Sequence, residues 1–91
     1  SKVGVRNERT RDVAILQGMG KACELKYLLT KASVEVGDEI VTSGLGGLFP
    51  KGILVGRISR VKKNPNRLFQ EVEVVPLVDF GKLEELFVIK K

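Results

Sequence analysis

Ser43 and Lys51 are the two side chains whose types and spacing could support catalysis, because a serine nucleophile can use a lysine as its general base. The sequence contains no histidine, which excludes Ser-His-Asp and Cys-His catalysis and most zinc sites. Ser43, however, stands beside Gly44 in a glycine-rich stretch, where a serine hydroxyl usually satisfies backbone groups of a turn. The sequence therefore predicts a protein that is not an enzyme.

Two pairs of carboxylates could instead act as acid and base or hold a metal ion. Glu71 and Glu73 alternate along an expected strand and point to its polar face, and Glu84 and Glu85 lie in a charged turn. We interpret both pairs as solvated surface. The triplet Asp79-Phe80-Gly81 also occurs in protein kinases, where it binds metal, but the other kinase signatures do not accompany it. No cofactor or metal site is predicted.

The glycine-rich stretch at positions 43–52 is the most distinctive part of the sequence. A phosphate-binding loop would need Gly-Lys-Ser/Thr after the glycines and a helical pattern beyond it, and neither follows. We therefore expect glycines with positive φ angles in tight turns, and Leu45, Leu48 and Phe49 closing one end of a barrel. The candidate residues, mainly structural with an interaction role as the alternative, are Ser43, Gly44, Leu45, Gly46, Gly47, Leu48, Phe49, Pro50 and Gly52.

The elements that position these residues read as short strands, since alternating apolar and polar residues recur and each run ends in turn residues. Strands are expected at 3–8, 12–17, 22–29, 39–42 and 53–61, in a sixth run that ends at Pro76, and at 85–90. Asp79 is expected to cap a helical turn over 79–84. The predicted fold class is all-β: a small antiparallel barrel of six or seven strands with a glycine-rich loop and one short helical turn near the C-terminus.

The alternation also predicts which side chains face the core. The expected inward residues are Val3, Val5, Val13, Ile15, Cys23, Leu25, Tyr27, Leu29, Val72 and Val74. Leu86 and Val88 are expected to close the sheet in the last strand. A single cysteine excludes an internal disulfide, so Cys23 is expected to be a small core residue.

One strand departs from strict alternation. Leu54, Ile58 and Val61 cannot share one face, which predicts a bulge near Ser59-Arg60. On the next strand, Glu71 and Glu73 are expected to have Arg57 and Ser59 as cross-strand neighbours.

Length and charge limit the organisation and the partners. Ninety-one residues are enough for one domain, predicted to span 1–91. The net charge of +5 favours acidic partners in a general way. Lys62-Lys63-x-x-x-Arg67 supports an alternative function, a small basic barrel that binds RNA or DNA, although few aromatic residues are available for base stacking.

A longer ordered set of residues carries a resemblance. It begins with Val36-Gly37-Asp38-x-x-Val41-Thr42-Ser43-Gly44-Leu45-Gly46-Gly47-x-Phe49-Pro50-x-Gly52-x-x-Val55-Gly56. Leu68-Phe69, then Glu73-Val74-x-Pro76, then Asp79-Phe80-x-x-Leu83-Glu84-Glu85-Leu86 follow in order. Together these residues resemble the MreC family of bacterial rod shape-determining proteins over 34–90, whereas residues 1–33 match only loosely.

The resemblance implies a β-barrel module on the periplasmic or extracytoplasmic face of the inner membrane. It implies a fragment of a longer protein that is anchored by an upstream transmembrane helix and a coiled coil. It also implies a scaffold for peptidoglycan synthesis in the cell-elongation machinery. The implied partners are a class B penicillin-binding transpeptidase, MreD and the MreB-linked complex, together with further copies of the same chain. Exposed edge strands are the first place at which binding is expected.

Overall fold

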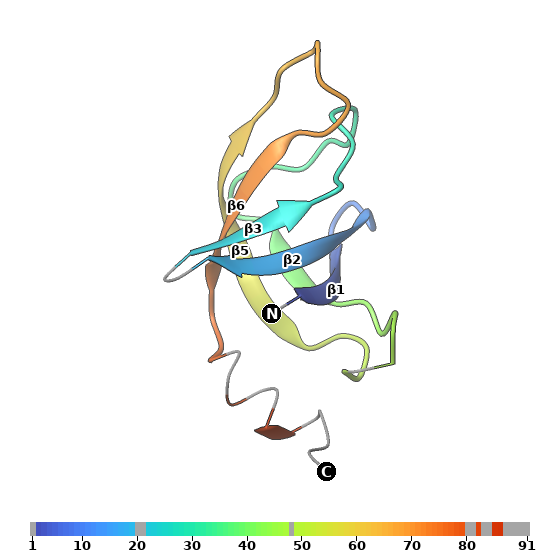
Figure 1. Ribbon diagram of the computed structural model, residues 1–91, viewed down its shortest axis with the longest axis vertical. Coiled ribbons are helices and arrows are strands. Elements are labelled where there is room, and N and C mark those ends of the chain that lie inside the picture. The colour runs from blue at the N-terminus through green and yellow to red at the C-terminus, as the bar shows by residue number, and fades with distance from the viewer. Residues whose placement is uncertain (1, 20–21, 48, 80–81, 83–84, 87–91) are drawn as a thin grey trace.

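Six antiparallel strands form the core of the computed structural model, which describes residues 2–19, 22–47, 49–79, 82 and 85–86 (Figure 1). The strands are β1 (Lys2–Asn7), β2 (Val13–Met19), β3 (Ala22–Lys26), β4 (Glu39–Thr42), β5 (Leu54–Lys62) and β6 (Glu71–Pro76). Each matches an expected strand to within a few residues at its ends. Among the described residues, no helix has the length and hydropathy needed to cross a bilayer.

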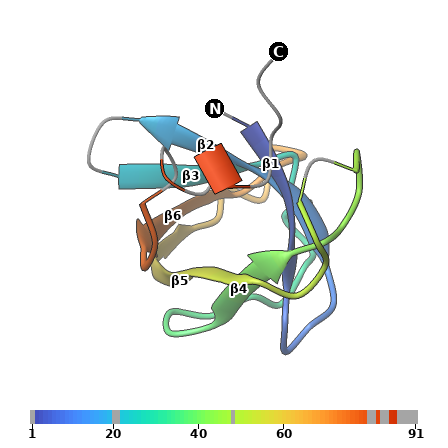
Figure 2. The ribbon, with the colours of Figure 1, turned by 90° about the horizontal axis from the view of Figure 1, so that it is seen from below.

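The strands close into a barrel in the order β1-β2-β3-β6-β5-β4, and β4 pairs with β1 to complete the ring. Figure 2 shows the strands arranged around this ring when the molecule is viewed from below. The all-β antiparallel barrel is therefore confirmed. Of the seventh expected strand, Glu85 and Leu86 are helical, and 87–90 lie outside the described residues.

Alternating side chains from all six strands fill the barrel. The buried cluster consists of Val3, Val5, Leu16, Cys23, Leu25, Leu28, Val34, Ile40, Phe49, Val55, Ile58, Val72 and Val74. The core predictions for β1 and β6 are confirmed, as are those for Cys23 and Leu25. Burial raises the pKa of the Cys23 thiol, which keeps it protonated and unreactive.

The predicted inward face of β2 is wrong. Val13 is exposed, whereas Leu16 is buried and Ala14 packs against the core. The cause is the pairing with β1, which sets Leu16 opposite Val3 and Ala14 opposite Val5. Cross-strand partners lie on the same face of a sheet, so the inward valines of β1 decide the face of β2.

The expected third strand is too long. β3 ends at Lys26, and Tyr27 adopts a φ of 68°, in the left-handed region. The alternation breaks there, so Leu28 turns into the core while Tyr27 and Leu29 are exposed.

The bulge predicted in β5 is confirmed, because the register with β6 shifts between Ile58 and Arg60. The shift corrects the predicted cross-strand neighbours. Arg60, rather than Arg57, pairs with Glu73 at 2.9 Å, and Arg57 pairs with Glu39 at 3.1 Å. The Ser59 hydroxyl does reach β6, where it donates to the Glu73 carbonyl at 3.3 Å.

The helical turn expected after β6 is described only in part. Lys82 N donates to Asp79 Oδ1 at 3.2 Å, which is the bond expected of a capping aspartate, and Lys82, Glu85 and Leu86 are helical. The other residues of that turn lie outside the described part of the chain.

Candidate interaction surfaces

The loop between β4 and β5, which we call the signature loop (43–52), is fixed to the barrel by Thr42 and Ser43. The Thr42 hydroxyl donates to the Pro50 carbonyl and accepts from Ile53 N at 2.8 Å. Ser43 N donates to the Gly4 carbonyl of β1 at 3.0 Å, and Ser43 Oγ accepts from Leu45 N at 3.1 Å. The Ser43 hydroxyl therefore satisfies a backbone group of the turn, as expected.

The glycines of the signature loop have the backbone geometry that was predicted. Positive φ angles occur at Gly44, Gly46, Gly47 and Gly52, between 70° and 91°. At Gly44, an added Cβ would also come within 3.1 Å of the Lys51 side chain. These positions therefore favour glycine for a conformational reason.

Only part of the predicted apolar plug is present. Phe49 is buried in the core cluster, as predicted. Leu45 is 65% exposed, so its predicted role in closing the barrel is wrong. Leu48 lies outside the described residues, and Pro50 is exposed. Whether these residues also contact a partner stays a prediction.

A buried carboxylate connects β1 to the turn that precedes β4. Asp38 is 8% exposed and accepts hydrogen bonds from Arg9 Nε at 2.8 Å and Nη2 at 2.9 Å. Asn7 Nδ2 donates to it at 2.9 Å and Glu35 N at 2.8 Å. The hydrogen bonds from the Arg9 guanidinium are the main reason that the pKa of Asp38 falls to about 2. The charge is thus compensated on several sides, which is typical of a structural carboxylate.

An exposed aromatic contact lies where the chain leaves β3 and where it enters β6. Tyr27 is 64% exposed, and its ring packs edge-to-face on Phe69 with centroids 5.7 Å apart. Phe69 also forms an isolated bridge with Leu29. Together with exposed Val13, these residues make an apolar patch that we call the Tyr27 surface (Val13, Tyr27, Leu29, Phe69).

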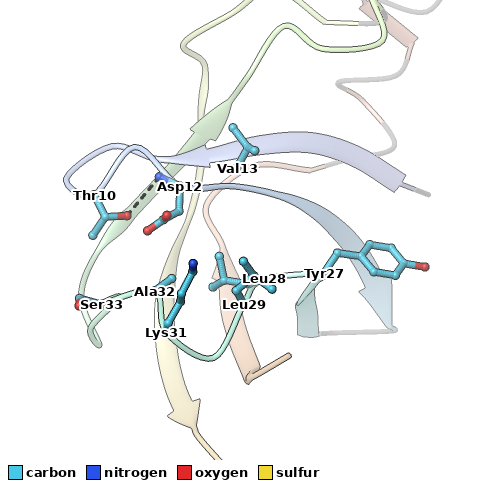
Figure 3. A pocket seen from close by; sticks show the side chains of 9 residues that line it. All are labelled: Thr10, Asp12, Val13, Tyr27, Leu28, Leu29, Lys31, Ala32 and Ser33. Atoms are coloured by element: carbon cyan, nitrogen blue, oxygen red, sulfur yellow. Dashed lines mark hydrogen bonds between the residues drawn. The ribbon is translucent and has the colours of Figure 1, made fainter. Parts of the chain in front are cut away.

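A depression of about 630 Å³ adjoins the Tyr27 surface, and Tyr27 lies at one side of it with its ring pointing away from the other lining side chains (Figure 3). Thr10, Asp12 and Val13 lie along one side, and Leu28, Leu29, Lys31, Ala32 and Ser33 lie opposite them. Gln70 supports this wall from beneath, because its Nε2 donates to the carbonyls of Leu29 at 2.8 Å and Ala32 at 3.0 Å. This side of the depression is thus tied to a buried side chain of the barrel.

Sequence reasoning missed the Tyr27 surface because it placed Tyr27 and Leu29 inside the barrel. The sequence does contain a sign that the alternation breaks after Lys26. Leu28-Leu29 puts two large apolar residues side by side, and strict alternation can bury only one of them.

The carboxylate pairs considered for chemistry do not gather into a site. Glu73 is held by Arg60, and Glu71 is exposed beside it on β6. Glu84 lies outside the described residues. Within the described ranges, no three His, Cys, Asp or Glu side chains are close enough to hold a metal ion.

Comparisons with known proteins agree with this geometry. The family model described as rod shape-determining protein MreC, barrel core, matches residues 1–90. The cell shape-determining protein MreC of Escherichia coli is 33% identical over 85 residues, which cover 93% of this chain and 23% of that protein. The protein of the same name from Listeria monocytogenes is 38% identical over 71 residues, which cover 78% of this chain and 24% of that protein.

Solved structures show the same barrel. The crystal structure of MreC from Pseudomonas aeruginosa matches with a TM-score of 0.79 and 34% identity, over 82% of this chain and 50% of that one. Another structure described as MreC gives 0.82 and 32% identity, over 86% of this chain and 46% of that one. The chain thus spans about a quarter of the length of the first two relatives and about half of these solved chains.

Proposed function

This chain belongs to the MreC family of rod shape-determining proteins, and from that premise we propose that it is a non-catalytic scaffold module of the bacterial cell-elongation machinery. In this proposal the barrel lies at the extracytoplasmic face of the inner membrane and holds a class B penicillin-binding transpeptidase. MreD, the MreB-linked complex and a second copy of the chain are further proposed partners. The Tyr27 surface is the proposed contact for the transpeptidase.

The scaffold role rests on the family membership, and the observation that assigns the contact to the Tyr27 surface is the backbone conformation of Tyr27. A φ of 68° places a bulky L-residue in the left-handed region, which costs about 1–2 kcal/mol relative to an ordinary conformation. Glycine or asparagine would adopt it more easily. The position instead holds the one tyrosine of the sequence, largely exposed to solvent. Strain that is retained beside an exposed aromatic ring is typical of a functional position.

The composition of the surface also supports a protein partner. Tyrosine and phenylalanine are enriched at the centres of protein interfaces, where a few aromatic residues contribute most of the binding energy. The depression beside Val13 would accept an apolar side chain of the partner. The Asp12 carboxylate and the Lys31 ammonium group also line the depression, where they would set the orientation of the partner.

The prediction that a partner binds at exposed edge strands loses its support. Each of the six strands has a neighbour on both sides in the closed barrel. Backbone pairing with an added strand needs an unpaired edge, so side-chain contact at the Tyr27 surface is the better supported mode.

The test is a binding titration between the purified chain and the extracytoplasmic region of an elongation-specific transpeptidase. Tyr27→Asn removes the ring but suits the left-handed backbone, so the fold should be retained. We expect at least about tenfold weaker binding, the usual effect of truncating a central aromatic contact. Leu77→Asn is the matched control, since it replaces another exposed apolar residue, beyond β6, with the same side chain.

The two variants separate the outcomes. Binding that falls for Tyr27→Asn and not for Leu77→Asn supports the assignment. Saturable binding of equal strength for the unsubstituted chain and both variants would show that the contact lies elsewhere on the barrel. No binding of the unsubstituted chain would reject the proposed partner for this module.

A further inference from the structure

A second exposed region lies at the end of β5 remote from the signature loop, at the top of Figure 1. The turn between β5 and β6 meets the segment after β3 there, because Thr30 N donates to the Leu68 carbonyl at 2.8 Å. We call this end the basic tip, and it comprises Leu29, Lys31, Lys62, Lys63, Pro65, Arg67 and Leu68. The tip adjoins the Tyr27 surface and shares Leu29 with it, and Lys31 also lines the depression beside that surface.

The charge of the tip is one-sided. Residues 25–34 and 60–70 together contain Lys26, Lys31, Arg60, Lys62, Lys63 and Arg67 and no Asp or Glu. Lys26 pairs with Glu24 at 3.2 Å, and Arg60 pairs with Glu73. For the four cations of the tip, no carboxylate within the described ranges lies at ion-pair distance, although Lys63 Nζ donates to the Ala32 carbonyl at 2.9 Å. The tip therefore presents a positive surface to any partner.

Aliphatic side chains lie among these cations. Leu68 is 67% exposed, and a shallow apolar groove there is lined by Leu29, Thr30, Lys31, Pro65, Arg67 and Leu68. Exposed aliphatic side chains interspersed with cations suit a surface that is apolar inside and negatively charged at its rim.

Several backbone groups of the tip already have hydrogen-bond partners within the protein, which matters for contact with an apolar phase. Arg67 N donates to the Asn64 carbonyl at 2.9 Å, and Asn66 N donates to Asn64 Oδ1 at 2.9 Å. The Thr30 hydroxyl donates to the Arg67 carbonyl at 2.8 Å. These groups would keep their hydrogen bonds when water is displaced, so their burial would not leave them unpaired.

We propose that the basic tip docks on an anionic phospholipid surface, with Leu68, Leu29 and Pro65 entering the interface and Lys31, Lys62, Lys63 and Arg67 contacting the headgroups. Long basic side chains can follow apolar neighbours to the interface while their charges stay among the phosphates. The apolar side chains that line the groove, Leu29, Pro65 and Leu68, are aliphatic and suit acyl chains. Stacking of nucleic-acid bases would instead use the exposed rings of Tyr27 and Phe69 in the adjoining Tyr27 surface. This inference does not depend on the transpeptidase, since the vesicle experiment below contains no protein partner.

The first test is co-sedimentation of the chain with vesicles of phosphatidylglycerol and phosphatidylcholine, compared with phosphatidylcholine alone. We expect binding to the anionic vesicles only. The variant Lys62→Gln/Lys63→Gln/Arg67→Gln should bind on the order of 100-fold more weakly, because each cation near such a surface contributes roughly a factor of five. The control Lys2→Gln/Lys51→Gln/Lys82→Gln has the same net charge but changes exposed residues outside the tip, and should bind like the original.

The second test reports insertion directly. The sequence has no tryptophan, so Leu68→Trp places a single indole at the tip. Its emission should shift to the blue on anionic vesicles. Leu45→Trp places the indole in the signature loop, at a residue that is exposed to a similar degree, and its emission wavelength should be the same with and without vesicles.

Each outcome of the two vesicle experiments either supports or overturns docking of the basic tip on anionic lipid. A loss of binding confined to the tip variant, with a blue shift confined to Leu68→Trp, supports the proposal. Equal loss in both charge variants, an unshifted Leu68→Trp, or no sedimentation with anionic vesicles would overturn it. Displacement of the chain from vesicles by single-stranded DNA with no blue shift would also overturn it, since it would identify the tip as a general polyanion surface.

Discussion

Asp38 shows how one carboxylate can fix the path of three segments. It joins the β1–β2 turn through Arg9, the end of β1 through Asn7 and its own turn through Glu35 N. The turn is made possible by Gly37, whose φ is 95°. Because Asp38 leads into β4, this network places β4 beside β1 and so closes the barrel. The Gly37-Asp38 pair in the sequence signature thus has a structural explanation.

The network predicts a loss of stability in acid. The pKa of Asp38 is about 2 in the folded protein against an ordinary value of 3.8, so the unfolded chain takes up its proton first. The charged carboxylate therefore contributes its full stabilisation above about pH 4, and this is lost as the pH falls toward 2. The shift corresponds to about 2 kcal/mol, measurable as the change in urea-unfolding free energy between pH 6 and pH 2.5.

Asp38→Asn distinguishes the contribution of Asp38 to this pH dependence from that of the other carboxylates. Among these is Glu8, whose pKa is lowered mainly by its hydrogen bond from Arg6. The variant should be less stable than the original at pH 6 and should show a smaller change with pH. If original and variant lose the same stability between the two pH values, Asp38 is not the group responsible.

At the scale of elements, β5 and β6 approach so closely that one position excludes any side chain. A Cβ added to Gly56 would lie 2.5 Å from Val74 Cγ1 and 2.7 Å from the Val75 carbonyl. Val74 is 1% exposed, so it has no free space to move into. The glycine is needed for close packing and not for its φ angle.

Gly56→Ala should therefore destabilise the barrel by about 1–3 kcal/mol, since overpacking a tight core forces side chains and backbone to shift. Urea unfolding would measure it. Gly18→Ala in β2 is the control, because nothing lies within 4 Å of its added Cβ, and it should be neutral or stabilising by up to about 1 kcal/mol. Equal stability of the two variants would show that β5 and β6 separate at low cost.

Most features of the individual strands and turns could be predicted from the sequence. Strand positions, the β5 bulge and the glycine turns follow from local residue types, and they are present in the structure. The face of β2 could not be read from Val13-Ala14-Ile15-Leu16, because four consecutive apolar residues fit either face. It is decided by the pairing with β1, which is not local in the sequence.

The candidate surfaces were harder to predict than the fold. The Tyr27 surface arises because a positive φ ends β3 early, and a tyrosine gives no warning of that conformation. The basic tip needs residues near 30 and near 65 to meet, although its Lys62-Lys63-x-x-x-Arg67 motif was visible in the sequence. Exposed surfaces depend on the tertiary fold, whereas strands and turns depend mostly on neighbouring residues.

For the molecule as a whole, the barrel is closed unevenly. Pairing between β1 and β4 is confined to residues 5–7 and 40–42, and that between β3 and β6 to 23–25 and 72–74, whereas β5 and β6 pair from 56 to 62 apart from the bulge. The β3–β6 pairing is extended by the bridge between Leu29 and Phe69. β4 is also the shortest strand among the described residues. The β1–β4 seam therefore depends on side-chain support, chiefly from Asp38 and Arg9, and we expect it to open before the rest of the barrel.

Native-state hydrogen exchange followed by NMR would test this order of opening. At the seam, Glu8 N donates to the Glu39 carbonyl at 2.9 Å and Ser43 N to the Gly4 carbonyl at 3.0 Å, whereas Leu77 N donates to the Val55 carbonyl at 2.9 Å beyond β6. The Glu8 and Ser43 amides should exchange through a local opening, and the Leu77 amide should exchange more slowly.

Arg9→Ala should speed exchange at Glu8 by about tenfold or more, because it removes both charged hydrogen bonds to Asp38. Arg60→Ala, which breaks an exposed pair on β5 and β6, should leave the seam unchanged. If Arg9→Ala accelerates all three amides by one common factor, the barrel opens only as a unit and the seam is no weaker than its other joins.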